Sequence, residues 1–418
     1  MNDEEFKMEF LKRIIQRYIE SRDFNGFYLD GTDQRERQTA IKLTQAGLVQ
    51  VVSEEDYPNP HIRPWPSRRT VEQQVASIST LTPDSYGVCL YPTPEGLKKQ
   101  RPSRRSTGQP YRQAMARGKG TLELAYYNFE VLEQYRNDPR FSFEFYDFGA
   151  KVDTTDKTYF DQSEPEHDKT GIQHIGFAYD LSSYDRGDPE SPVIRRVCAF
   201  YGDLAELSPV HQQRWKTYEV KPDSLKPHPV WWGQQMGHWA DAPGPFEQFF
   251  FELKSLNELH ARAFGKPLFR TDERPSDFGW ILRPSQHEWD RFIQDLDKLL
   301  SDNISHEALD LPGVPRLDGA GKNIGTLNRL ETLLTTRGNS TENIKKVLKP
   351  FRKVRQARQK PAHTLRKNIT DKTFVHKQIA LLEDVTATLS ALRYFWQSHP
   401  KNKEWTPRFG DSERNYRM

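Results

Sequence analysis

The chain has 418 residues, with 61 Lys or Arg against 58 Asp or Glu, so its formal net charge is only +3. Any affinity for nucleic acid must therefore come from local clusters of charge and not from the whole surface. Its two cysteines, Cys89 and Cys198, are too few for a disulfide scaffold or a cysteine-based zinc finger. No apolar run resembles a signal peptide or approaches the ~18 residues of a membrane span, so we expect a cytoplasmic protein with no membrane partner.

The first helix is predicted over Glu4–Glu20, where apolar residues recur at helical spacing. A second helix is expected at about Asp33–Gln45, and two short strands are expected at Leu48–Val52 and His61–Trp65. Two helices followed by a two-stranded wing resemble a winged helix-turn-helix, which we assign to residues 1–97. Such modules bind DNA or dock other proteins, and the sequence leaves both roles open.

Residues 98–120 are predicted to form a basic linker, because Lys98–Lys119 holds eight Lys or Arg and no acidic residue. The next segment, Leu122–Tyr135, is predicted to be a helix. Beyond it, strands and helices are mixed without a βαβ repeat, which indicates an α+β middle domain at residues 121–310. Its expected strands are Phe141–Phe148, Ile172–Asp180 and Val193–Tyr201, and its expected helices are about Glu247–Ala263 and Gln286–Ser301.

The sequence holds neither a G-x-x-x-x-G-K-[ST] nor a G-x-G-x-x-G loop, which argues against an ATPase or a Rossmann enzyme. One segment, SEPEHDKTGIQH, does gather side chains that could bind a metal ion. The spacing of these residues matches no metal-ligand motif, and the run is typical of a loop between strands. We therefore expect no metal and no cofactor. The residues concerned are Glu164, Glu166, His167, Asp168 and His174.

A Pro- and Gly-rich linker at residues 311–325 is expected to separate the middle domain from an all-helical region at residues 326–400. A charged tail follows at residues 401–418. The fold class predicted is therefore α+β and multidomain, ending in an all-α bundle. The expected helices of this bundle are Thr326–Thr336, a helix from Asn339 or Ser340 to about Gln359, and a long helix from Asp371 to about Ser398.

The second helix of the bundle carries an apolar stripe that ends at Phe351 and Val354. Pro350 should kink or restart the helix just before these residues. Arg358 follows Val354 by four positions, so it continues the stripe on the inward face. Because burying a guanidinium group is costly unless it is paired or faces a cleft, Arg358 is a candidate functional residue.

Pro361 is predicted to break this helix, because proline lacks a backbone donor and clashes with the carbonyl group of Ala357. On an unbroken helix, positions 358 and 363 would stand about 140° apart around the axis. A break between them would let His363 turn towards Arg358. Alternatively, the two residues could line one groove in a dimer.

The charge around this pair is one-sided. Ten Lys or Arg and no acidic residue lie between Lys345 and Lys367. Such a run predicts a face that attracts phosphate, although a solvated basic helix with an incidental histidine remains the alternative. The residues expected to contact a nucleic-acid backbone are Lys345, Lys349, Arg352, Arg355, Arg366 and Lys367.

An arginine followed after four to six residues by a histidine, at the end of a helix in a small C-terminal bundle, resembles the HEPN superfamily. The resemblance covers about Thr326–His399. It implies that Arg358 and His363 are the catalytic pair of a metal-independent ribonuclease that works as a homodimer. His363 would act as general base or acid, and Arg358 would stabilise charge on the phosphate. Gln359 stands where active members often carry Asn, Asp or His.

A second pair, Arg393 and His399, has a similar spacing. It lies among apolar residues of the long helix, with no basic cluster and no break before the histidine. Context therefore favours the first pair as the site.

The leading hypothesis is an endoribonuclease effector or toxin of prokaryotic antiviral (phage) defence, which cleaves RNA by 2′-OH transesterification in a dimer groove. In this hypothesis the middle domain senses a protein or phage-derived trigger and restrains the C-terminal site. The alternative is a non-catalytic nucleic-acid-binding regulator or scaffold that uses the winged helix and the basic segments.

Overall fold

Helices and two β-sheets are both present in the computed structural model, so the predicted α+β class is confirmed. The chain forms two compact units. The first comprises Met1–Phe143, Gly149–Asp180 and Arg195–His228, and the second comprises Glu144–Phe148, Leu181–Ile194 and Pro229–Met418. The structure describes residues 2–20, 25–56, 69–82, 87–99, 108–181, 194–221, 223–238, 243–338, 340–363 and 367–406, without the side chains of residues 360–363.

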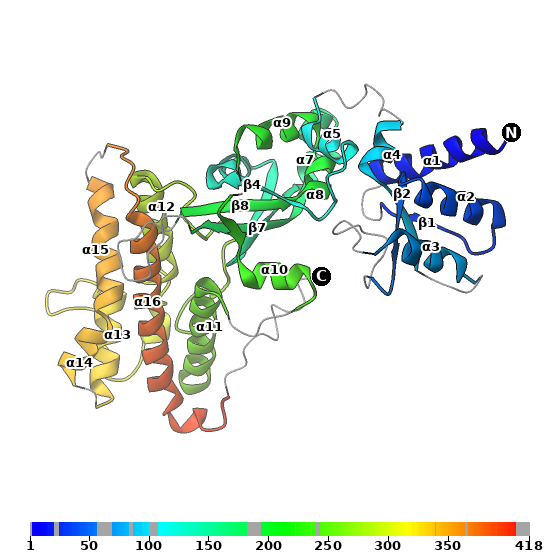
Figure 1. The fold of residues 1–418 in the computed structure, drawn as a ribbon. Helices are drawn as coiled ribbons and strands as arrows, with labels where there is room; N and C mark the ends of the chain where they lie inside the picture. Colours follow the sequence, from blue (N-terminus) through cyan, green and yellow to red (C-terminus); the bar gives the residue numbers. More distant parts are fainter. Residues whose placement is uncertain are drawn as a thin grey trace. The chain divides into compact units, whose positions relative to one another are not determined.

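The N-terminal part of the first unit is a three-stranded sheet covered by helices (Figure 1). Phe10, Leu11 and Ile14 of the first helix are buried in its core. The helix predicted over Glu4–Glu20 from its apolar spacing is therefore confirmed. The strand order is β1-β3-β2. The elements are α1 (Asp3–Glu20), β1 (Phe27–Tyr28), α2 (Gln34–Gln45), β2 (Val49–Ser53), α3 (Val71–Ser79) and β3 (Val88–Pro92).

The first predicted wing strand is present as β2, but its partner differs from the prediction. Strand β2 pairs antiparallel with β3, from Val49 opposite Pro92 to Ser53 opposite Val88. Helix α3 lies between these strands in the chain, so they do not form a simple hairpin. The predicted second strand, His61–Trp65, lies outside the described residues.

Part of the predicted basic linker, residues 98–120, is helical. Helix α4 (Pro94–Lys99) leads into it, and helix α5 (Pro110–Ala116) packs against α8 (Tyr201–Glu206) and α9 (Pro209–Thr217) of the same unit. Tyr111 and Met115 are buried four positions apart, which explains why a helix forms within a basic run. Pro110 occupies the first turn, where its missing N–H costs nothing.

The rest of the first unit is built on a seven-stranded sheet with the order β5-β6-β7-β8-β4-β9, and β10 pairs with β7. All three strands predicted for the middle region are present. The predicted helix Leu122–Tyr135 is wrong, because its first part is strand β4. The strands are β4 (Leu124–Asn128), β5 (Phe141–Phe145), β6 (Gly149–Thr154), β7 (Ile172–Asp180), β8 (Ile194–Phe200), β9 (Glu219–Val220) and β10 (Leu225–Pro227).

Short helices connect these strands. Two of them, α7 and α9, flank the loop that contains the predicted acidic and histidine-rich segment. Next to the α9 helix lies a short 3₁₀ helix, Glu166–Asp168. The α-helices of this part are α6 (Glu133–Asn137), α7 (Asp156–Phe160), α8 (Tyr201–Glu206) and α9 (Pro209–Thr217).

The second unit is mainly helical. Helix α11 packs along α16, and α12 packs along α15 (Figure 1). Helices α11 and α12 were predicted for a middle domain ending at residue 310, yet they share a unit with the C-terminal helices. The helices are α10 (Pro229–Gln235), α11 (Pro245–Phe264), α12 (Gln286–Leu299), α13 (Thr326–Thr336), α14 (Thr341–Val347), α15 (Lys349–His363) and α16 (Phe374–Gln397).

The boundaries of the C-terminal helices follow the sequence closely. Helix α13 ends before Gly338, whose φ of 93° is the left-handed conformation that glycine tolerates best. Ser340 is the N-cap of α14, and the chain restarts as α15 at Lys349, so Pro350 falls in the first turn of a new helix. Among the described helices, none combines the length and apolar character needed to cross a membrane.

Candidate functional site

The predicted Arg-His pair lies at the C-terminal end of α15, which is unbroken from Lys349 to His363. The predicted break at Pro361 is therefore wrong. Pro361 is two residues from the end of the helix, so the helix loses one hydrogen bond, to the carbonyl group of Ala357, and little helix remains beyond it. Positions 358 and 363 consequently stand about 140° apart around the helix axis.

Arg358 lies on the inward side of α15, as its place after Val354 predicted. Its side chain is 32% exposed, and its Nη1 donates to Oδ2 of Asp297 over 2.7 Å. The same nitrogen also donates to Oδ2 of Asp302. Arg355, one turn earlier, donates to the same two carboxylates, with 2.8 Å to Oδ2 of Asp297. We call these four side chains the arginine–aspartate cluster.

The two carboxylates of this cluster have different environments. Asp297 is fully buried on α12, whereas the Asp302 side chain is 37% exposed in the turn that follows. Burial alone would raise the pKa of Asp302, but hydrogen bonds from Arg355 and Arg358 outweigh it and hold the pKa below its usual value. The hydrogen bond to Asp297 raises the pKa of Arg358, so this guanidinium group is charged near neutral pH.

Asp297 and Asp302 were not predicted as site residues. One signal was available in the sequence, since Asp297 follows the buried Ile293 by four positions and so falls on the apolar face of its helix. An aspartate on an apolar face requires a cationic partner. The partner itself could not be read from the sequence, because Arg358 is 61 residues away.

Three of the six residues predicted to hold an RNA backbone lie at the surface. Lys345, Lys349 and Lys367 are exposed, and so is Gln359 beside the motif. Arg366 and the side chain of His363 lie outside the described part of the chain. Among the described residues, these lysines have no ion-pair partner, whereas Arg352, Arg355 and Arg358 of α15 pair with carboxylates.

Acidic residues far away in sequence neutralise part of this basic face. Arg352 pairs with Glu331 of α13, and Lys353 lies 3.8 Å from Asp384 of α16. The prediction of a face without acidic counterparts considered only the local sequence. Tertiary contacts make the attraction for phosphate weaker than ten uncompensated charges would give.

The second Arg-His pair has a structural role. Arg393 is buried in α16 and pairs with Glu252 of α11, with 2.5 Å between Nε and Oε2 and 3.2 Å between Nη2 and Oε1. His399 caps the following turn by accepting from the backbone N–H of Lys401. Neither side chain belongs to the arginine–aspartate cluster.

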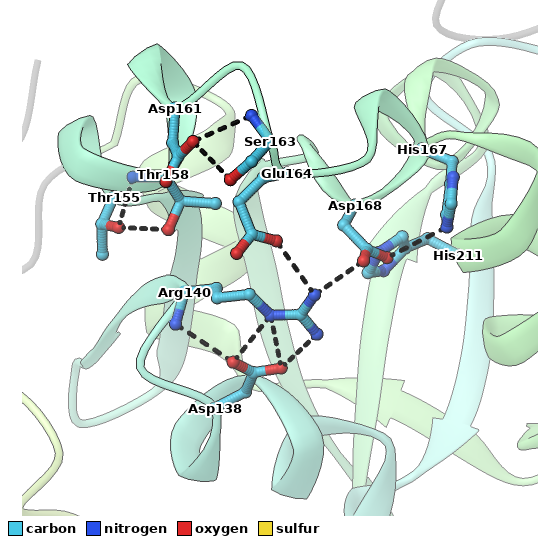
Figure 2. A network of polar contacts seen from close by, with 10 residues as sticks. All are labelled: Asp138, Arg140, Thr155, Thr158, Asp161, Ser163, Glu164, His167, Asp168 and His211. Carbon is cyan, nitrogen blue, oxygen red and sulfur yellow. Dashed lines mark hydrogen bonds and ion pairs between the residues drawn. The ribbon is translucent and has the colours of Figure 1, made fainter.

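A second polar cluster lies in the first unit, around Arg140 (Figure 2). The Arg140 Nη1 donates to Oδ2 of Asp168 over 2.7 Å and lies 3.6 Å from Oε2 of Glu164. Its Nη2 donates to Oδ2 of Asp138 over 2.8 Å, and the hydrogen bond from Arg140 lowers the pKa of Asp138. Three carboxylates thus converge on one guanidinium group and fix the loop that carries the predicted acidic segment.

Behind this loop, a chain of hydrogen bonds runs into the core. Trp215 Nε1 donates to the Tyr135 hydroxyl over 2.9 Å, and that hydroxyl is hydrogen-bonded to His211 Nδ1 over 2.7 Å. The other ring nitrogen, His211 Nε2, lies 3.9 Å from Oδ1 of Asp168. Burial lowers the pKa of His211 to about 4, so the ring is neutral at pH 7.

This environment predicts a pH dependence of stability. A neutral His211 contributes stability that is fully present above the unfolded pKa of about 6.5 and is lost as the pH falls towards about 4. Between about pH 6.5 and 4.5, we expect the free energy of unfolding of the wild type to fall by on the order of 2 kcal/mol more than that of His211→Gln. Urea unfolding at each pH measures the difference.

The exposed neighbour His167 provides the control, since its Nε2 lies 3.7 Å from the same Asp168 carboxylate. The free energy of unfolding of His167→Gln should change with pH in the same way as that of the wild type. Parallel profiles for the wild type and His211→Gln would contradict the buried neutral histidine.

Among the described residues, no group of three or more His, Cys, Asp or Glu side chains is arranged to hold a metal ion. Comparisons with protein-family models, curated proteins and solved structures found no match to the chain.

Proposed function

We propose that the second unit is a metal-independent endoribonuclease whose site contains Arg358 and His363. The observation that carries the proposal is the placement of Arg358 at the end of α15, with one nitrogen clamped by Asp297 and Asp302 while the side chain stays 32% exposed. In the described part of the chain, its Nε and Nη2 carry no hydrogen bond. A guanidinium group fixed in this way presents free donors to a phosphate without losing its orientation.

The proposed reaction is an internal transesterification. The ribose 2′-oxygen attacks phosphorus and loses its proton to a base, while the bond from phosphorus to the 5′-oxygen breaks and that oxygen gains a proton. The products are a 2′,3′-cyclic phosphate and a 5′-hydroxyl end. His363 supplies one of the two proton transfers, and Arg358 stabilises the charge on the non-bridging oxygens.

The proposed site is shared between two chains. Because α15 is unbroken, positions 358 and 363 of one chain stand about 140° apart and do not converge. A two-fold dimer brings Arg358 of one protomer opposite His363 of the partner subunit, and it creates two such sites. The exposed Lys345, Lys349 and Lys367 would hold the RNA backbone on either side.

Cleavage of RNA in EDTA tests this function. We expect the wild type to cleave, and Arg358→Ala and His363→Ala to lose about 10²- to 10⁴-fold in rate. Arg355→Ala breaks the same ion-pair cluster one turn earlier, so it should reproduce any loss of stability caused by Arg358→Ala. Glu258→Gln, which breaks an exposed pair with Arg262 outside the cluster, is the control and should keep the wild-type rate. Equal rates for the wild type and His363→Ala, or cleavage that EDTA abolishes, would reject the proposal.

The role proposed for the rest of the chain is recognition and restraint. The N-terminal helices and their β1-β3-β2 sheet support a winged-helix-like docking or DNA-binding module, although α3 interrupts the expected hairpin. The seven-stranded sheet region would bind a protein or phage-derived trigger. Together with the nuclease, this arrangement corresponds to an effector or toxin of prokaryotic antiviral defence that acts in the cytoplasm.

A second candidate is a non-catalytic nucleic-acid-binding regulator or scaffold. The same ion pairs favour it, because Asp297 and Asp302 account for the inward position of Arg358 without any reaction. In that case Arg358→Ala lowers stability as much as Arg355→Ala does, and RNA binds without being cleaved. The EDTA experiment therefore separates the two candidates.

A further inference from the structure

The arginine–aspartate cluster contains an anion held between two guanidinium groups. The Asp302 carboxylate gives one oxygen to Arg355 Nη1 and the other to Arg358 Nη1. Proteins also use pairs of arginine guanidinium groups, such as these two, to bind phosphate. The position that the Asp302 carboxylate occupies is therefore an anion site that is filled by the chain itself.

The two aspartates of the cluster differ in burial. Asp297 is fully buried, and its Oδ2 accepts from both arginines, so it is a fixed part of the unit. Asp302 is 37% exposed and stands in a turn whose backbone is anchored by its own N–H bond to the carbonyl oxygen of Asp297. Among the described residues, its carboxylate has no hydrogen-bond partner besides the two guanidinium groups. Rotation of the Asp302 side chain away from the arginines therefore breaks only these two contacts of the described residues.

The charges favour a particular replacement. With Asp302 turned away, two arginines and Asp297 leave one net positive charge. A phosphodiester group carries one negative charge per nucleotide, as the Asp302 carboxylate does, so an exchange of one for the other leaves the cluster neutral. A phosphate also offers two non-bridging oxygens, one for each guanidinium group.

We propose that Asp302 is an internal substitute for the RNA phosphate, which restrains Arg358 until a phosphodiester group displaces it. This inference rests on the proposed function, because it assigns Arg358 its substrate-bound partner. It makes Arg355 the second phosphate ligand of the site and Asp302 a negative regulator of RNA binding.

The test measures binding of a 2′-O-methyl RNA oligonucleotide, which cannot be cleaved because it lacks the attacking hydroxyl group. We expect Asp302→Asn to lower Kd about tenfold relative to the wild type, since it removes the competing carboxylate. Asp384→Asn is the matched control. It removes one exposed carboxylate of α16, beside Lys353 of α15, and we expect Kd to change by less than about twofold.

Three further measurements make the result decisive. Adding Arg355→Ala to Asp302→Asn should cancel the gain, and Asp302→Ser should reproduce it if asparagine perturbs the turn. Equal gains from Asp302→Asn and Asp384→Asn would overturn the proposal, since only net charge would then matter. Displacement of the oligonucleotide by inorganic phosphate at low millimolar concentration would assign the site to free phosphate and overturn the assignment to RNA.

Failure of this inference differs from failure of the proposed function. If the wild type cleaves RNA but Asp302→Asn binds no more tightly than Asp384→Asn, the function stands and the internal substitute is wrong. If Asp302→Asn binds more tightly and no protein cleaves, the anion site stands and the ribonuclease is wrong.

Discussion

Glu252→Gln is expected to lower the free energy of unfolding of the second unit by about 3–5 kcal/mol. Glu252 and Arg393 are 2% and 7% exposed, and their paired hydrogen bonds join α11 to α16. Glutamine cannot neutralise the guanidinium group, so a buried positive charge would remain without its counter-ion. Urea unfolding followed by circular dichroism measures the change.

Two variants check that the effect comes from the unpaired charge. The double variant Glu252→Leu with Arg393→Met removes both charges and should be within about 2 kcal/mol of the wild type. Glu258→Gln breaks an exposed pair with Arg262 on the same helix α11, and it should cost less than about 1 kcal/mol. A small effect of Glu252→Gln, equal to that of Glu258→Gln, would show that water reaches the pair.

Mixed dimers of Arg358→Ala and His363→Ala are expected to cleave RNA although neither variant does so alone. If each site takes its arginine and its histidine from different protomers, a mixed dimer has one complete site and one site lacking both residues. Random pairing makes half of the dimers mixed, so the preparation should recover about a quarter of wild-type activity. Co-expression with two affinity tags followed by RNA cleavage measures this recovery.

The control is a mixture of Arg358→Ala with the double variant Arg358→Ala/His363→Ala, which contains no intact Arg358 and must stay inactive. Recovery in the first mixture and not in the second supports the shared site. No recovery in either mixture would place both residues of each site in one chain, and the unbroken α15 would then have to bend at Pro361.

The sequence predicted the longer elements better than the short ones. Strand β7 and helix α13 have the predicted limits, Ile172–Asp180 and Thr326–Thr336. The segment Leu122–Tyr135 was predicted as a helix but begins as strand β4. In β4, Ala125 and Tyr127 are buried and alternate with half-exposed residues, and a period of two over five residues is too short to distinguish from helix.

Partners that are distant in the sequence could not be predicted. A periodic pattern shows which face of an element is buried, but not what covers that face. For this reason the pairing of β2 with β3 was missed, as was the contact between Arg358 and Asp302, 56 residues apart. The inward position of Arg358 was predicted correctly because it depends only on its spacing from Val354.

Because α11 packs on α16 and α12 packs on α15, the C-terminal helices depend on residues that precede them in the chain. Residues 326–400 look modular in the sequence, yet expressing them alone would strip α16 of its buried partner Glu252 and α15 of Asp297. The smallest fragment that keeps both of these contacts therefore begins before α11. A gene fusion that carried only the Arg-His segment would deliver the motif without the carboxylates that orient it.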